Sequence, residues 1–194
     1  MPVSLLPKLL LYIIIIGYSP GPANVYALSC ALKYGRKRAL NMWRGLLTGF
    51  SIAVVLVAVA AHLLGTAMGE DVIYLRYAGA AYILWLAWNI VRNDVNADES
   101  HHCTFVDGMI VQLTNVKMIL FAFTAYGTFV LPYTNTMIAL LEVAVLLLLA
   151  GPVANLFWLL VGAWMRPFFL HYHRIVNVVM AVSLVACAVM VAIG

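Results

Sequence analysis

The chain has 194 residues, of which 65% are hydrophobic and 9% are charged, with a mean hydropathy of +1.02 and a formal net charge of +4. Soluble domains are nearer half apolar and a quarter charged, so this composition excludes a soluble fold. The positive charge comes from Lys and Arg in short connectors and not from a basic face on a soluble module, which excludes nucleic acid as a partner. We expect a single transmembrane domain over residues 1–194, with the lipid bilayer as its solvent.

Apolar runs of membrane length fill nearly the whole sequence. About 20 apolar residues cross the hydrocarbon core of a bilayer. Six runs meet that length, at approximately 4–33, 43–65, 72–91, 105–131, 136–164 and 172–193. The connectors between them are short, at Tyr34–Met42, Thr66–Asp71, Arg92–Thr104, Pro132–Asn135 and Met165–His171. The sequence therefore predicts an all-α integral membrane protein with six transmembrane helices.

Lys and Arg gather in alternate connectors, which predicts the orientation in the membrane. Eight of the 11 lie in or beside the first, third and fifth connectors, at Lys33, Arg36, Lys37, Arg38, Arg44, Arg92, Arg166 and Arg174. Only Lys8 and Arg76 lie on the other side, and Lys117 lies inside a span. Connectors rich in Lys and Arg stay in the cytoplasm. We therefore expect both termini outside the cytoplasm.

Pro20, Gly21 and Pro22 interrupt the first run near the middle of the bilayer. The prolines have no N–H and Gly21 permits a positive φ, so the backbone here cannot stay fully paired within one helix. Such backbone survives in a membrane only inside protein or beside a water-filled cavity. The half-helix that starts at Ala23 and Asn24 points its positive end at this break. Broken helices commonly build transporter sites; the alternative is a packed proline kink without a ligand.

A polar cluster lies inside the fourth run, at Gln112, Thr114, Asn115 and Lys117. A lysine at the centre of a span costs about 2.5–3.5 kcal/mol on insertion scales. Three interpretations of Lys117 stay open. It is a substrate or gating contact, a proton carrier whose charged form is disfavoured by loss of water, or a lock that pairs with backbone carbonyls and holds helices together.

The break and the polar cluster occupy corresponding places in two halves of the chain. The halves, about 1–92 and 105–194, each contain three predicted spans and are joined by a cytoplasmic connector at about 93–104. Because three is odd, the halves have opposite orientations in the membrane. This pattern predicts two inverted three-helix repeats, with helix 1 broken at Pro20-Gly21-Pro22 and a site at the midplane between the repeats.

Three stretches resemble the LysE/RhtB superfamily of bacterial amino acid exporters: SPGPANVYALSCALKYGRKRAL, LRYAGAAYILWLAWNI and LTNVKMILFAFTAYGTFVLP. The resemblance covers essentially the whole chain. Pro20-Gly21-Pro22 matches the first family motif, and Asn115-Val116-Lys117 matches the second. The Val form of the second motif, with AAYILWLAWNI and FVLP, looks most like the cysteine/O-acetylserine exporter branch. Ala23 replaces a usual Asn or Asp. Val116 replaces a usual proline, so unwinding of the fourth helix stays an open question.

The resemblance implies a secondary transporter in the bacterial cytoplasmic membrane that exports a small amino acid and is driven by protons. We expect the N–H groups at Ala23–Asn24 and the ammonium of Lys117 to meet the substrate carboxylate. Carbonyls at residues 17–19 and the amide oxygens of Asn24 and Asn115 would meet its ammonium. The predicted substrate-binding residues are Pro20, Gly21, Pro22, Ala23, Asn24, Gln112, Asn115 and Lys117.

No ATP-binding pattern is found in the sequence, and we expect neither enzyme activity nor a cofactor nor a metal. Lys117, Glu142 and Arg76 are candidates for coupling or gating; Glu142 and Arg76 with His62 form either an outer gate or a surface ion pair. Two other functions stay open: a cation or metal exporter on the same fold, and a non-transporting membrane assembly protein. The sequence also leaves open whether the chain forms a homo-oligomer.

Two further features concern packing. Gly45 and Gly49 form a Gly-x-x-x-Gly motif, which predicts a close approach between helices. Cys30, Cys103 and Cys187 are widely spaced and form no Cys-x-x-Cys pattern. Cys30 and Cys187 lie in predicted spans, where cysteine usually acts as a small apolar residue. The wide spacing argues against a facing thiol pair for electron transfer.

Overall fold

The computed structural model describes residues 2–19, 21–68 and 103–193, together with seven single positions between residues 74 and 88. Beyond Val161 it describes the backbone and a few side chains. The described chain is helical and contains no strand. Its elements are η1 (Val3–Leu5), α1 (Leu6–Tyr18), α2 (Pro22–Met68), α4 (Phe105–Leu113), α5 (Val116–Phe129) and α6 (Met137–Ile193).

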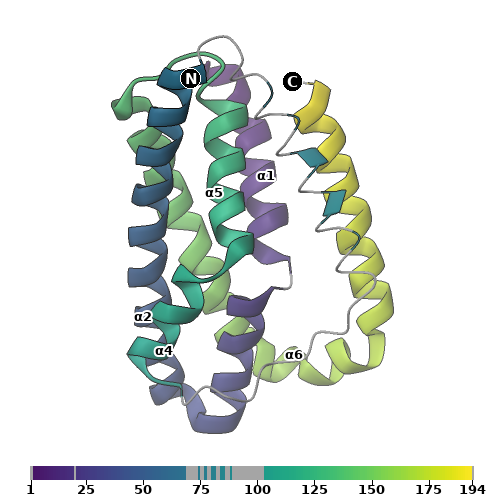
Figure 1. Cartoon of the computed structure of the whole chain (residues 1–194). Coiled ribbons are helices and arrows are strands. Elements are labelled where there is room, and N and C mark those ends of the chain that lie inside the picture. The colour runs from purple at the N-terminus through teal and green to yellow at the C-terminus, as the bar shows by residue number, and fades with distance from the viewer. Residues whose placement is uncertain are drawn as a thin grey trace.

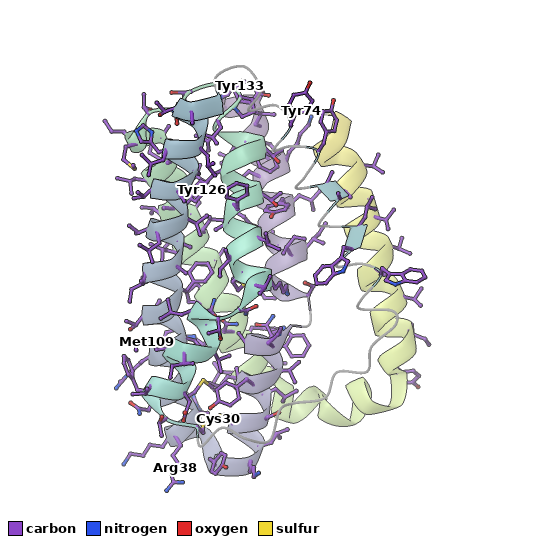
Figure 2. The ribbon with its side chains drawn as sticks, in the orientation of Figure 1. Cys30, Arg38, Tyr74, Met109, Tyr126 and Tyr133 are labelled. Atoms are coloured by element: carbon purple, nitrogen blue, oxygen red, sulfur yellow. A yellow bond between two sulfur atoms is a disulfide. The ribbon has the colours of Figure 1, made fainter. Side chains whose placement is uncertain are left out.

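The helices run alongside one another in a bundle (Figure 1). The start of α1 and the end of α6 lie at the same end of the molecule, and Arg38 lies at the opposite end (Figures 1 and 2). This placement requires an even number of passes between the ends. The core between α1, α2 and α5 includes Tyr12, whose hydroxyl donates to the carbonyl of Phe121 at 2.8 Å, and Tyr126, whose hydroxyl donates to the carbonyl of Val54 at 3.2 Å.

The predicted connector Tyr34–Met42 is wrong in extent, because these residues are helical except at Gly35. Gly35 has a φ of 78° and a ψ of 165°, a conformation that glycine adopts without the steric cost of a Cβ. One glycine therefore reverses the chain, and the Lys- and Arg-rich residues after it continue as helix, which suits their high helix propensity. The predicted connector Met165–His171 is helical too, and α6 departs from helical geometry at Tyr172.

Length and hydropathy allow fewer spans in the described residues than the sequence predicts in the whole chain. Pro22–Ala67 and Met137–Val161 are long and apolar enough to cross a membrane, and α4 with α5 makes a third candidate if that bent pair is one span. Apart from the seven single positions, the predicted third span at 72–91 lies outside the described residues, as does most of the third connector. The predicted start of the fourth span is confirmed by a capping box, in which Thr104 and Asp107 cap the start of α4.

Glycines bring α2 and α4 into close backbone contact, which confirms the predicted role of the Gly-x-x-x-Gly motif. A Cβ at Gly45 would collide with the carbonyl of Phe105, and a Cβ at Gly49 would lie 2.7 Å from the carbonyl oxygen of Met109. Gly108, on α4, faces α2 in the same way. The contact holds α4 against α2 and so positions the helix break that follows α4.

The expectation of separate cysteines is wrong for two of the three. Cys30 and Cys103 form a disulfide between α2 and the residue pair that precedes α4, with the Cα atoms 5.7 Å apart (Figure 2). The backbone N–H of Cys103 also donates to the hydroxyl of Tyr26 on α2 at 3.1 Å. The two cysteines are 73 residues apart in sequence, and they meet because α4 packs back against α2. The side chain of Cys187 lies outside the described residues.

We predict that Gly45→Ala destabilises the folded protein, because the added methyl group must push α4 away from α2. Overpacking of this kind costs about 1–3 kcal/mol. The measurement is the melting temperature of the purified protein in detergent. Gly17→Ala is the matched control, because its Cβ would lie 3.9 Å from the Cβ of Ala154, an ordinary contact. Equal melting temperatures for the two variants would contradict the close approach.

Candidate functional site

The first break separates α1 from α2 and is bridged by Asn24. Ser19 follows the end of α1 in an extended conformation, with φ −62° and ψ 146°. The side-chain amide of Asn24, in the first turn of α2, reaches back and donates to the carbonyls of Gly17 at 3.0 Å and Ser19 at 2.9 Å. Asn24 is buried, with 3% of its surface exposed. The predicted interruption is therefore confirmed at Ser19–Gly21; Pro20 lies outside the described residues.

The second break separates α4 from α5, although Val116 provides no proline. α4 ends at Leu113, α5 begins at Val116, and the two helices are bent by 53°. Asn115 is the N-cap residue, with an extended ψ of 93°, and its side chain makes no capping hydrogen bond. The question that the sequence left open is thus resolved: the helix is broken without its usual proline. Lys117 lies in the first turn of α5.

Lys117 brings the two breaks together. Its ammonium donates to the carbonyl of Ser19 at 2.7 Å, and 7% of the residue is exposed. A Cβ added at Gly21 would lie 2.8 Å from Cδ and 3.0 Å from Nζ of Lys117, so the absence of a side chain at Gly21 makes room for the lysine. The ammonium lies at the C-terminal end of α1, where the helix dipole favours a cation.

Two residues of α6, Asn155 and Trp158, complete this cluster and were missed by sequence reasoning. The indole N–H of Trp158 donates to the carbonyl of Tyr18 at 3.1 Å, and the side-chain amide of Asn155 donates to the amide oxygen of Asn24 at 2.6 Å. The available signal was an asparagine within an apolar run, shortly after Gly151 and Pro152.

The carbonyls at the end of α1 therefore already have protein donors. Ser19 accepts from both Asn24 and Lys117, which uses the two lone pairs of its oxygen. We expected these carbonyls to meet the substrate ammonium. In the structure these carbonyls instead accept hydrogen bonds from protein side chains, so the substrate ammonium needs other acceptors.

Several buried polar atoms have no hydrogen-bond partner within the described part of the chain. They are both amide atoms of Gln112, the amide oxygens of Asn115 and Asn155, and the hydroxyl of Thr128. An unsatisfied buried polar group costs about 1–3 kcal/mol. Gln112, Asn115 and Asn155 come from α4, the α4–α5 break and α6. These groups can accept or donate hydrogen bonds to a polar ligand.

The predicted gate residues are not gathered in the described structure. Glu142 is exposed on α6, and Arg76 lies outside the described residues. His62 instead lies beside Asn135, with 3.2 Å between its Nδ1 and the amide oxygen of Asn135. The amide nitrogen of Asn135 donates to the carbonyl of His62 at 3.2 Å and the hydroxyl of Thr66 at 2.8 Å. The gate therefore stays a prediction.

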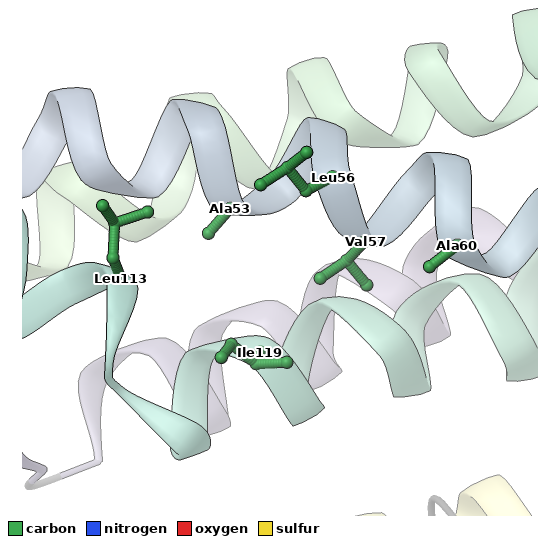
Figure 3. A pocket seen from close by; sticks show the side chains of 6 residues that line it. All are labelled: Ala53, Leu56, Val57, Ala60, Leu113 and Ile119. Atoms are coloured by element: carbon green, nitrogen blue, oxygen red, sulfur yellow. The ribbon is translucent and has the colours of Figure 1, made fainter.

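An apolar hollow of about 250 Å³ lies between α2 and the α4–α5 break (Figure 3). Its lining side chains are all apolar: Ala53, Leu56, Val57, Ala60, Leu113 and Ile119. A zwitterion needs hydrogen-bond partners for both of its charges. The hollow offers none, so the polar cluster at the two breaks is the candidate site. Within the described residues, no group of three or more His, Cys, Asp or Glu side chains is placed to hold a metal ion.

Comparisons with known proteins agree on one family. Residues 14–194 match the family described as LysE type translocator. Cysteine/O-acetylserine efflux proteins of Escherichia coli strain K12 and Shigella sonnei strain Ss046 are each 37% identical to this chain over 188 residues, which is 96% of both chains. A protein of the same name from Escherichia coli O139:H28 is 36% identical over the same length. No solved structure gives a significant match.

We predict that Gly21→Ala displaces the ammonium of Lys117 from Ser19. Loss of a hydrogen bond to a charged group costs about 1.5–3 kcal/mol, so the melting temperature in detergent should fall. In a Lys117→Ala background the added methyl group meets no lysine, and Gly21→Ala should then cause little further loss. Additive losses in the double variant would show that Gly21 and Lys117 act independently.

Proposed function

Because the chain belongs to the family of LysE type translocators, we propose that it exports a small amino acid of the cysteine or O-acetylserine type from the cytoplasm. The family places the protein among transporters and not among enzymes. The proposed substrate class follows the printed names of relatives that are 37% identical over 96% of the chain. Apolar helices of membrane length fit a multi-pass protein of the bacterial inner membrane.

One observation carries the proposal: two helix breaks from distant parts of the chain meet at one buried polar cluster. Lys117, at the start of α5, donates to Ser19, at the end of α1, although 98 residues separate them. A purely structural break would be expected to pair all of its polar groups. Here both amide atoms of Gln112 and the amide oxygen of Asn115, which precede Lys117 in sequence, have no partner among the described residues, as a site that exchanges water for substrate requires.

We propose that the substrate carboxylate binds where the starts of α2 and α5 and the ammonium of Lys117 make the cluster positive. The first N–H groups of α2, at Pro22–Asn24, and of α5, at Val116–Lys117, lack intrahelical acceptors as at any helix start, except that Pro22 has no N–H. Helix starts attract anions, and the ammonium of Lys117 adds a full charge. A carboxylate beside Lys117 would compete with Ser19 for that ammonium. The amide oxygen of Asn115 is one acceptor for the substrate ammonium.

Export against a gradient requires an energy source, and we propose the proton gradient. The sequence shows no ATP-binding pattern. Lys117 is the proton-carrier candidate, because it is buried and lies where the substrate would bind. Glu142 and Arg76 are retained as gating candidates at the outer end.

We further propose that the chain crosses the membrane six times as two inverted repeats, about 1–92 and 105–194, with both termini outside. The two breaks would then be equivalent points of the repeats. The start of α1 and the end of α6 lie at the same end of the molecule, which supports an even number of crossings (Figure 1). The distribution of Lys and Arg supports the orientation.

Reporter fusions test this topology. We predict that a fusion after residue 36 reports a cytoplasmic location and that a fusion after residue 194 reports an external one. The physical reason is the cluster of positive charge at Arg36–Arg38. A fusion after residue 194 that is active only in the cytoplasm would contradict the proposed orientation.

Transport in inverted membrane vesicles tests the function. We predict uptake of labelled cysteine and O-acetylserine that exceeds uptake of threonine, homoserine and lysine and that rises when a proton gradient is imposed. Equal uptake by vesicles without the protein would contradict the proposal.

Lys117→Met in the same vesicles tests the site. We predict that the apparent affinity for O-acetylserine falls at least about tenfold, because a charged hydrogen bond is worth about 1.5–3 kcal/mol. Lys37→Met is the control, since Lys37 is exposed. Unchanged affinity with lost response to the pH gradient would identify Lys117 as a proton carrier only. Unchanged affinity and coupling in a less stable protein would identify it as a helix lock.

A further inference from the structure

The hydrogen bonds of Asn24 fix which end of the Asn155 side-chain amide is the nitrogen and which is the oxygen. Here Asn24 directs one end of its amide at two carbonyl oxygens, those of Gly17 and Ser19. That end must be the nitrogen, because only a donor satisfies two acceptors. The opposite end, which faces Asn155 at 2.6 Å, is therefore an oxygen.

The orientation of Asn155 follows. Its nitrogen must donate to the oxygen of Asn24, so its own oxygen points elsewhere. That oxygen is buried, and it has no hydrogen-bond partner within the described part of the chain. Asn155 is 3% exposed. The fold thus holds an acceptor in place beside the first break and leaves it unpaired.

The chemistry of this acceptor complements the rest of the cluster. Lys117 and Asn24 donate to the same oxygen of Ser19, and Asn24 accepts from Asn155. A chain of hydrogen bonds therefore connects the ammonium of Lys117 to the amide of Asn155, whose oxygen has no partner among the described residues. An amino acid carries a carboxylate and an ammonium a few bonds apart, and it needs one positive and one acceptor group at similarly short range.

We infer that the amide oxygen of Asn155 accepts a hydrogen bond from the ammonium of the transported amino acid and makes Asn155 a specificity-determining residue. The inference rests on the proposed function and adds to it the group that selects for a free amino group. A site that hydrogen-bonds a substrate N–H discriminates strongly against an analogue that lacks it, because the acceptor is then left buried and unpaired.

Competition for uptake of labelled O-acetylserine into inverted vesicles tests the inference. The two competitors are unlabelled O-acetylserine and 3-acetoxypropanoate, which is the same acid without its ammonium. The measured quantity is the ratio of their inhibition constants. We expect the wild type to favour O-acetylserine and Asn155→Leu, which keeps a similar volume without an acceptor, to reduce that ratio about tenfold or more.

Two further variants separate substrate contact from helix packing. Asn155→Asp keeps an acceptor oxygen and loses the N–H that donates to Asn24. It should therefore lower the melting temperature, while its ratio should not fall below that of the wild type, because a carboxylate also accepts from an ammonium. Trp43→Phe removes a hydrogen bond between α2 and the carbonyl of Pro152 on α6, outside the polar cluster, so it should lower the melting temperature and leave the ratio unchanged. If Asn155→Leu is too unstable to assay, a collapsed ratio in Asn155→Asp would still overturn the inference.

The outcomes are distinct from those that test the proposed function. An unchanged ratio in a folded Asn155→Leu variant would overturn the role of Asn155 and leave the proposed function intact, because transport itself would persist. Absence of O-acetylserine and cysteine transport by the wild type would overturn the proposed function and this inference with it. A reduced ratio in Asn155→Leu with a normal ratio in Trp43→Phe supports the inference.

Discussion

The hydrogen bonds that complete the C-terminal end of α1 are the constraint on which the architecture depends. A helix that stops within a membrane leaves carbonyl groups that cannot reach bulk water, and the protein must supply donors for them. Asn24, Lys117 and Trp158 supply them. Because these donors belong to α2, α5 and α6, the point where α1 stops fixes the depth at which three other helices place polar side chains in an apolar bundle.

The same hydrogen bonds give the proposed substrate a means to change the packing of helices. A ligand shifts a conformational equilibrium only as far as it binds the two states with different free energies. A carboxylate that draws the ammonium of Lys117 from Ser19 would weaken the contact between α5 and α1. An ammonium on Asn155 would act on α6 in the same step. Binding and helix movement would then share a small set of hydrogen bonds.

The sequence predicts features that depend on local chemistry and misses those that depend on tertiary packing. The interruption beside Gly21 was predictable because proline and glycine act on their own backbone. The break at Asn115 has no such local cause, because Val116 is not a proline and the side chain of Asn115 makes no capping hydrogen bond, so the sequence left it open. Asn155 could not be assigned, since its partner lies 131 residues away. The Cys30–Cys103 disulfide was missed for the same reason, because it forms only when α4 packs against α2.

The charge of the cluster favours an amino acid over a metal or other cation as the cargo. Among the described residues, Lys117 is the only buried side chain that carries a formal charge. The starts of α2 and α5 add two positive helix ends to the same region. A transported cation would meet this field with no buried carboxylate in the described part of the chain to balance it, and its desolvation would be costly. A zwitterion brings its own anion, so its carboxylate balances Lys117 while its ammonium requires only neutral acceptors such as the amide oxygens of Asn115 and Asn155.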